Sequence, residues 1–92
     1  MEKILLAALQ RLIALCEECN QQYSRKILSP GIGWTTRIDE IKTILRSAGM
    51  SVNTKRDMRC EKYYACIEFQ ANNAEIQTIA ESIGFKNGVY KF

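Results

Sequence analysis

The chain has 92 residues, of which 47% are hydrophobic and 25% are charged, with one proline and five glycines. This composition is that of a globular protein with one modest core, and it excludes a disordered or low-complexity chain. The chain contains thirteen Lys and Arg residues and ten Asp and Glu residues, so it is mildly basic with a net charge of +3. We expect one domain over residues 1–92, with a helix in residues 1–24 and an α+β core in residues 25–92.

Residues 2–24 predict a long amphipathic helix, because apolar side chains recur at helical spacing. They are Leu5, Ala8, Leu12, Leu15, Cys16 and Cys19, and the stripe is widened beyond half the circumference by Leu6, Leu9 and Ile13. So wide a stripe calls for cover on two sides. We therefore expect part of it to pack on the domain and part to meet a second copy or a protein partner.

The same segment resembles neither a membrane span nor a secretory signal. The apolar run from Ile4 to Leu9 is short and is interrupted by Gln10 and Arg11, and Leu15 before Cys16 does not suit cleavage after small residues. The expected location is the cytoplasm, with no membrane contact. Cysteines there are thiols, and a zinc site would need all four sulfurs because histidine is missing. We predict no metal and no cofactor.

The middle of the chain predicts a second helix and a hairpin. Residues 25–29 can form a short strand, residues 30–31 a turn, and residues 32–34 a loop that exposes Trp34. Thr35 or Thr36 can cap a helix that runs to Ala48 and ends at Gly49. Strands are expected over residues 51–58 and 63–70, joined by a turn at residues 59–61.

The part of the chain after residue 70 predicts one more helix and a last strand. Asn72, with Glu75 three residues later, matches a capping box. Ile76, Ile79 and Ala80 begin a helical apolar stripe, and Gly84 can end that helix. Residues 88–92 read as a short strand. If residues 25–29 are a strand, residues 25–92 follow a βαββαβ order, the ferredoxin-like split-βαβ plan.

Alternation over residues 62–69 sorts that strand onto two faces. Ala65, Ile67 and Phe69 point one way, and Lys62, Tyr64, Cys66 and Glu68 point the other. The octet resembles the signature strand of RNA-recognition motifs through Lys62, Tyr64, Ala65, Ile67 and Phe69, with Tyr63 in place of glycine and Cys66 in place of an aromatic. The resemblance implies an RRM-like sheet on which Tyr64 stacks on a base.

A second resemblance uses an overlapping part of the chain. Thr36-Arg37-Ile38, Leu45 to Met50 and Val52-Asn53-Thr54 are similar to the helix and wing of small winged-helix proteins of phages and plasmids. That resemblance implies a DNA-reading helix followed by a β-hairpin wing. The winged helix therefore stays open as an alternative fold.

Catalysis is poorly supported by the sequence. Histidine is missing, acidic residues do not pair on a rigid segment, and Gly31-Ile32-Gly33 lacks the lysine and serine of a phosphate-binding loop. We expect a binding protein without a small-molecule substrate.

Two binding functions remain open. The first is a nucleic-acid-binding module for RNA or DNA, with these expected contact residues: Arg37, Lys42, Arg46, Lys55, Arg56, Arg59, Lys62 and Tyr64. The second is a protein-interaction module, such as an adaptor or a compact inhibitor from a phage or plasmid. Its expected surface for a protein partner or for homodimer formation consists of Leu6, Leu9, Ile13 and Trp34.

Overall fold

The computed structural model describes residues 2–22, 32–56 and 62–92. Within these ranges the chain forms an α+β structure, and the elements follow in this order: α1 (Glu2–Gln22), α2 (Ile32–Ser47), β1 (Ser51–Lys55), β2 (Cys66–Gln70), α3 (Ala74–Ser82) and β3 (Val89–Lys91). The strands form one antiparallel sheet in the order β1-β2-β3. The α+β class expected from the sequence is confirmed.

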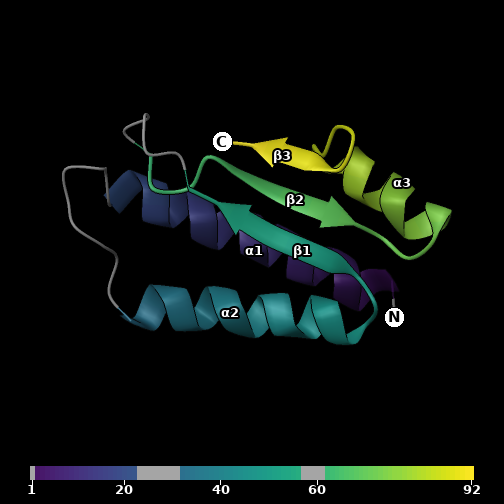
Figure 1. Ribbon diagram of the computed structural model, residues 1–92, viewed down its shortest axis with the longest axis horizontal. Coiled ribbons are helices and arrows are strands. Elements are labelled where there is room, and N and C mark those ends of the chain that lie inside the picture. The colour runs from purple at the N-terminus through teal and green to yellow at the C-terminus, as the bar shows by residue number, and fades with distance from the viewer. Residues whose placement is uncertain (1, 23–31, 57–61) are drawn as a thin grey trace.

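The sheet has one covered and one open face (Figure 1). Helix α1 lies behind the sheet, α2 runs along the side of β1, and α3 lies at the end where β2 finishes. The outward side chains include Asn53 on β1, Glu68 on β2 and Lys91 on β3, all of them exposed. Among the described elements, none covers this face.

The finer βαββαβ order is not confirmed. Its first strand, expected at residues 25–29, lies outside the described residues. In a split-βαβ sheet that strand would separate the last two strands of the domain, whereas here β2 and β3 pair directly through Ile67 with Tyr90 and Glu68 with Val89. The observed sheet therefore differs from the predicted arrangement.

The predicted hairpin of residues 51–70 is present, with shorter strands. Val52 pairs with Phe69 and Thr54 with Ile67, so these inward side chains share the covered face. Strand β2 begins at Cys66 rather than at Tyr63. The described part of β1 ends at Lys55, and the expected turn at residues 59–61 lies outside the described residues.

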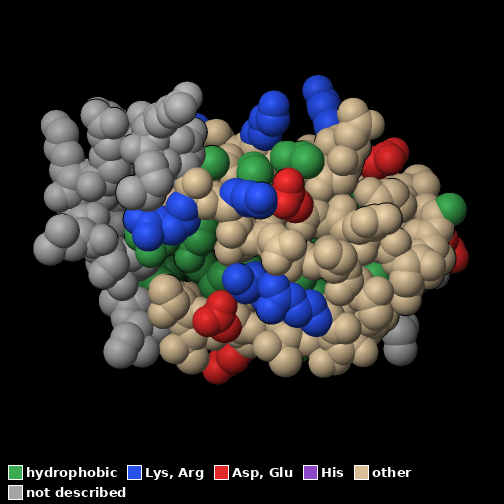
Figure 2. All heavy atoms as spheres, in the orientation of Figure 1, with side chains coloured by type: hydrophobic (Ala, Val, Ile, Leu, Met, Phe, Trp, Pro, Cys, Tyr) green, Lys and Arg blue, Asp and Glu red, His purple; other side chains and the backbone are tan. Residues whose placement is uncertain are grey.

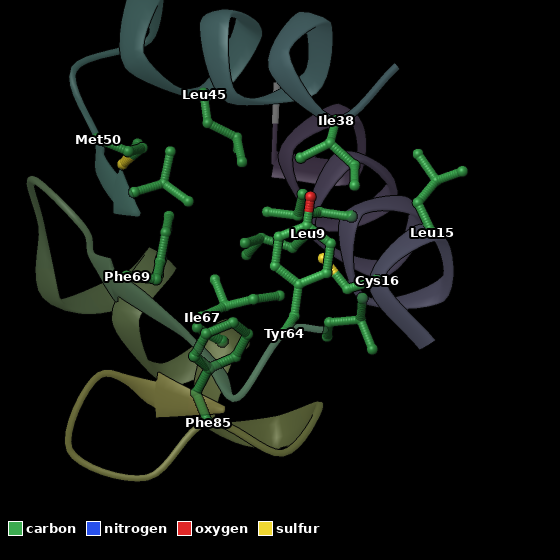
Figure 3. Packing of buried hydrophobic residues seen from close by; sticks show 14 of the residues in the cluster. Leu9, Leu15, Cys16, Ile38, Leu45, Met50, Tyr64, Ile67, Phe69 and Phe85 are labelled. Atoms are coloured by element: carbon green, nitrogen blue, oxygen red, sulfur yellow. The ribbon is translucent and has the colours of Figure 1, made fainter. Parts of the chain in front are cut away.

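The core lies between α1, α2 and the covered face of the sheet (Figure 3). Leu9 and Cys16 of α1, Ile38 and Leu45 of α2, and Ile67 of β2 have relative exposures of 0–1%. Phe69 and Phe85 extend this core toward α3, with ring centroids 5.8 Å apart. The wide stripe of α1 is thus buried against elements of the same chain.

Helices α2 and α3 end at the glycines that the sequence indicated. Gly49 has φ +91° and Gly84 has φ +118°, backbone angles that side chains rarely allow. After each helix two backbone N–H groups turn back to the last carbonyls, as Met50 N–H does to Leu45 and Phe85 N–H to Ala80. This arrangement satisfies carbonyls that a helix end leaves open.

The predicted starts of both helices were wrong. Helix α2 begins at Ile32, so Trp34 lies inside it and packs, half-buried, against the core instead of standing in an exposed loop. Helix α3 is capped by Asn73, whose Oδ1 accepts from Ile76 N–H at 2.9 Å. Asn72 instead donates to the Ala48 carbonyl at 3.2 Å, which links the start of α3 to the end of α2.

Candidate nucleic-acid interface

Two cations of α2 reach across to β1. Lys42 Nζ donates to Thr54 Oγ1 at 3.3 Å and lies 3.5 Å from Asp39 Oδ1. The Arg46 guanidinium donates to the Val52 carbonyl at 2.8 Å and to Asn53 Oδ1 at 3.3 Å. These contacts fix both side chains at the seam between α2 and β1. The exposed Arg46 keeps further N–H groups available for an anion, whereas the Lys42 side chain is only 16% exposed and contacts Thr54 of the covered face.

Two further cations stand at the end of β1. Lys55 Nζ lies 3.6 Å from Glu68 Oε1 in an exposed ion pair, which holds its geometry only weakly. The Arg56 guanidinium carbon lies 4.0 Å from the centroid of the Tyr63 ring. This cation–π contact orients Arg56 without neutralising it.

We call Lys42, Arg46, Lys55 and Arg56 the basic band. Figure 2 shows Lys and Arg side chains gathered over α2 and β1, on the same side as the open sheet face. Asp39 and Glu68 are the carboxylates that contact the band, so the band keeps an excess of positive charge. Charge of one sign beside an uncovered surface attracts polyanions.

Other expected contact residues lie elsewhere. Arg37 is exposed but lies about 140° around α2 from Lys42, whereas Arg46 lies only about 40° away. Lys62 lies near the end of β3, where it lines a hollow of about 290 Å³ together with Lys91 and Phe92. Arg59 lies outside the described residues. Of the seven predicted contact residues that the structure describes, it brings together four.

The expectation that Tyr64 stands exposed for base stacking was wrong. Its relative exposure is 5%, and its ring packs among Leu9, Cys16 and Ile67 (Figure 3). The chain is not yet in β2 at this position, so strand alternation does not apply to it. Burial raises the pKa of the Tyr64 hydroxyl, and the neighbouring thiols Cys16 and Cys19 raise it further.

The expected partner surface on α1 was also largely wrong. Leu9 is fully buried and Ile13 is 8% exposed, because both belong to the core. Leu6 is half-buried. The exposed large apolar side chains of the described residues are instead Ile4, at 66%, and Ile44, at 50%. Neither was singled out by the sequence, because single apolar residues at a stripe edge give no distinct signal.

A polar hollow of about 730 Å³ lies where the open face meets α3. Carboxamide side chains dominate its lining: Asn53, Gln70, Asn72, Asn73, Gln77 and Asn87. It adjoins the basic band directly, because Asn53 contacts Arg46 and Glu68, another lining residue, contacts Lys55. Sequence reasoning missed this hollow, since its residues come from three separate segments, 51–53, 68–77 and 87–89.

Two of the three described cysteines lie apart from this surface and the third is isolated on it, while Cys60 lies outside the described residues. Cys16 and Cys19 are buried, and desolvation raises the pKa of Cys16 to about 12 and that of Cys19 to about 11. Cys66 is a free, half-buried thiol on β2. Across residues 2–22, 32–56 and 62–92, no three side chains of ligand type gather in a way that could hold a metal ion.

Comparisons of the chain with family models, with curated proteins and with solved structures found no match. In the described ranges, no helix is both long and apolar enough to cross a membrane.

Proposed function

We propose that this chain is a non-enzymatic module that binds the sugar–phosphate backbone of a nucleic acid along the basic band. The observation that carries the proposal is the grouping of Arg46, Lys55 and Arg56 beside an open sheet face, with Lys42 next to them between α2 and β1 and with Arg46 and Arg56 oriented by their contacts. Cations that are already oriented lose less side-chain entropy on binding. Phosphate contacts of this kind give affinity without sequence preference.

The open face supports backbone binding more than base stacking. The outward positions of the sheet carry Ser51, Asn53 and Lys55 on β1, and Cys66, Glu68 and Gln70 on β2, with Val89 and Lys91 on β3. No aromatic ring stands among these described positions, and Tyr63 and Tyr64 are buried. These outward positions therefore provide no aromatic surface for RRM-like base stacking. Most of the apolar stripe of α1 is buried in the core and is not available to a partner.

The test compares two double variants that remove the same charge. Lys55→Gln with Arg56→Gln changes the basic band, and Arg11→Gln with Arg37→Gln changes exposed positions outside it. Binding of fluorescent single-stranded RNA, single-stranded DNA and duplex DNA is measured by anisotropy over a range of salt concentrations. We expect wild-type affinity to fall with salt, since bound cations release counterions from the nucleic acid.

The band variant should reduce the slope of log affinity against log salt by about 1.4–1.8, at about 0.7–0.9 for each lost phosphate contact. The control variant should keep the wild-type slope. Equal slopes for the two variants would show that binding does not use the band. Absence of binding by the wild type at low salt would overturn the proposed function altogether.

A further inference from the structure

Beyond phosphate binding, the amide hollow has a defined hydrogen-bonding character. Three of its carboxamides have their oxygen atoms committed to donors that can bond only to an acceptor. Asn53 Oδ1 accepts from the Arg46 guanidinium, Asn73 Oδ1 accepts from Ile76 N–H, and Gln77 Oε1 accepts from Ala71 N–H at 2.9 Å. The identity of each amide oxygen is thereby set, and so is the direction of each NH2 group.

The NH2 groups of these three carboxamides are therefore donors that the hollow offers. Within the described residues, Asn53 Nδ2 and Gln77 Nε2 make no hydrogen bond, and Asn73 Nδ2 uses one of its two hydrogens on Asn72 Oδ1. Glu68 lines the same hollow as an acceptor. The hollow thus suits a neutral group that carries several acceptors and at least one donor.

We infer that the hollow holds an unpaired keto base of a single-stranded nucleic acid whose phosphates lie on the basic band. This inference rests on the proposed function and adds the kind of strand and base. Keto bases present carbonyl acceptors, as guanine does with O6 and thymine with O4, and their ring N–H can donate to the Glu68 carboxylate. Adenine has no carbonyl and presents an amino donor to a surface already rich in donors.

Single strands are favoured for two reasons. A base can offer its pairing edge only when it is unpaired. The hollow and the basic band are also continuous through the contacts of Asn53 with Arg46 and Glu68 with Lys55, so one strand can occupy both. The volume of about 730 Å³ lies within the range of small-ligand sites.

The experiment compares labelled RNA octamers of uridine and of adenosine, together with an RNA duplex of equal phosphate number. For the wild type we expect the uridine octamer to bind about 10-fold tighter than the adenosine octamer, which corresponds to one or two net hydrogen bonds. The duplex should bind no better than the adenosine octamer. The ratio of the two octamer affinities is the readout, because backbone charge contributes equally to both.

Two variants change the hollow without removing its internal bonds. Gln77→Glu and Asn53→Asp keep an oxygen for Ala71 N–H and for Arg46, but they replace the NH2 donor by a second acceptor. Each should bring the ratio close to 1. Gln10→Glu adds the same charge on the exposed side of α1 and should leave the ratio at its wild-type value.

The outcomes separate the two proposals. Equal wild-type affinity for both octamers, with a normal salt slope, would overturn the keto-base site and leave backbone binding in place. Loss of the salt slope would overturn the proposed function instead. If an uncharged tetraglycine peptide, and not the uridine octamer, shifts the Asn53 and Gln77 NH2 signals in NMR spectra, the hollow is a peptide site and the inference is wrong.

Discussion

Asn20 takes the place of a strand partner for the segment that leads into β2. Its Oδ1 accepts from Tyr64 N–H at 2.7 Å, and its Nδ2 donates to the Tyr64 carbonyl at 3.0 Å. One side chain thereby satisfies both backbone groups of a residue that precedes the sheet. The sequence does not reveal this role, because an asparagine near the polar edge of a helix has no spacing that singles it out.

Replacing Asn20 by alanine should lower the free energy of unfolding by about 2–3 kcal/mol, because two partly buried backbone groups lose their partners. Urea unfolding followed by circular dichroism measures this loss. Gln21→Ala is the matched control, since Gln21 is the exposed neighbour and should change stability by less than about 0.5 kcal/mol. Equal midpoints for the two variants would refute the role of Asn20.

At the scale of elements, α1 is the main internal support of the fold. Its Leu9, Leu12 and Cys16 are fully buried. Helices α2 and α3 contact this helix, and its buried side chains belong to the same core as those of the sheet. The apolar stripe of α1 is therefore wide because several elements of the same chain pack against it.

Leu9→Ala should accordingly lower the free energy of unfolding by about 2–5 kcal/mol, the usual cost of truncating a fully buried leucine. Ile4→Ala, at a position that is 66% exposed on the same helix, should change it by less than about 0.5 kcal/mol. Urea unfolding and sedimentation of both variants provide the comparison. A change of oligomeric state in Leu9→Ala without loss of stability would restore the partner-surface interpretation.

Periodicity predicted most of the elements, and tertiary contacts decided the rest. The helical stripe of α1, the hairpin, and the glycines at 49 and 84 were predicted because each depends on neighbours in sequence. The start of α2 was missed because Trp34 is held in the helix by core packing four residues before Ile38. Tyr64 was wrongly expected to be exposed because it precedes β2, where packing against α1 rather than strand alternation buries its ring.

The candidate site could be predicted only in part. Lys55 and Arg56 are consecutive in the sequence, so their grouping could be predicted from it. The rotation of α2 against β1 decides that Lys42 and Arg46 belong to the basic band and that Arg37 does not. The amide hollow depends on the spatial meeting of segments that the sequence separates, and no local pattern signals it.

Considered as a whole molecule, the described part of the protein has an interior without charge. No polar or charged residue is buried there, and the ionisable groups inside are thiols and phenols. Histidine is missing from the chain. Stability should therefore change little near neutral pH and respond mainly to alkaline conditions.

The alkaline response follows from the buried thiols. The pKa of Cys16 is raised from 9.0 to about 12 and that of Cys19 to about 11, so above pH 9 the unfolded chain releases thiol protons that the folded chain retains. The stabilisation is complete below pH 9 and declines as pH rises toward 11 and 12, by up to about 1.4 kcal/mol per pH unit for each thiol.

Urea midpoints of the wild type, measured under reducing conditions between pH 7 and pH 10.5, should fall more steeply above pH 9 than those of a Cys16→Ala, Cys19→Ala variant. Burial raises the pKa of Tyr64 in both proteins, whereas the further rise caused by the thiols is lost in the variant, so the difference in slope reports the two thiols together with their effect on Tyr64. Parallel curves would show that these thiols titrate alike in the folded and unfolded chains.

The open face of the sheet also bears on how this sequence can change. Its outward side chains point away from the core, so residues such as Ser51, Glu68 and Gln70 can be exchanged at small cost to folding. Binding preference and structural stability are then carried by opposite sides of the same strands. A library randomised at these outward positions should consequently remain mostly folded, which makes the protein a compact scaffold for selecting new specificities.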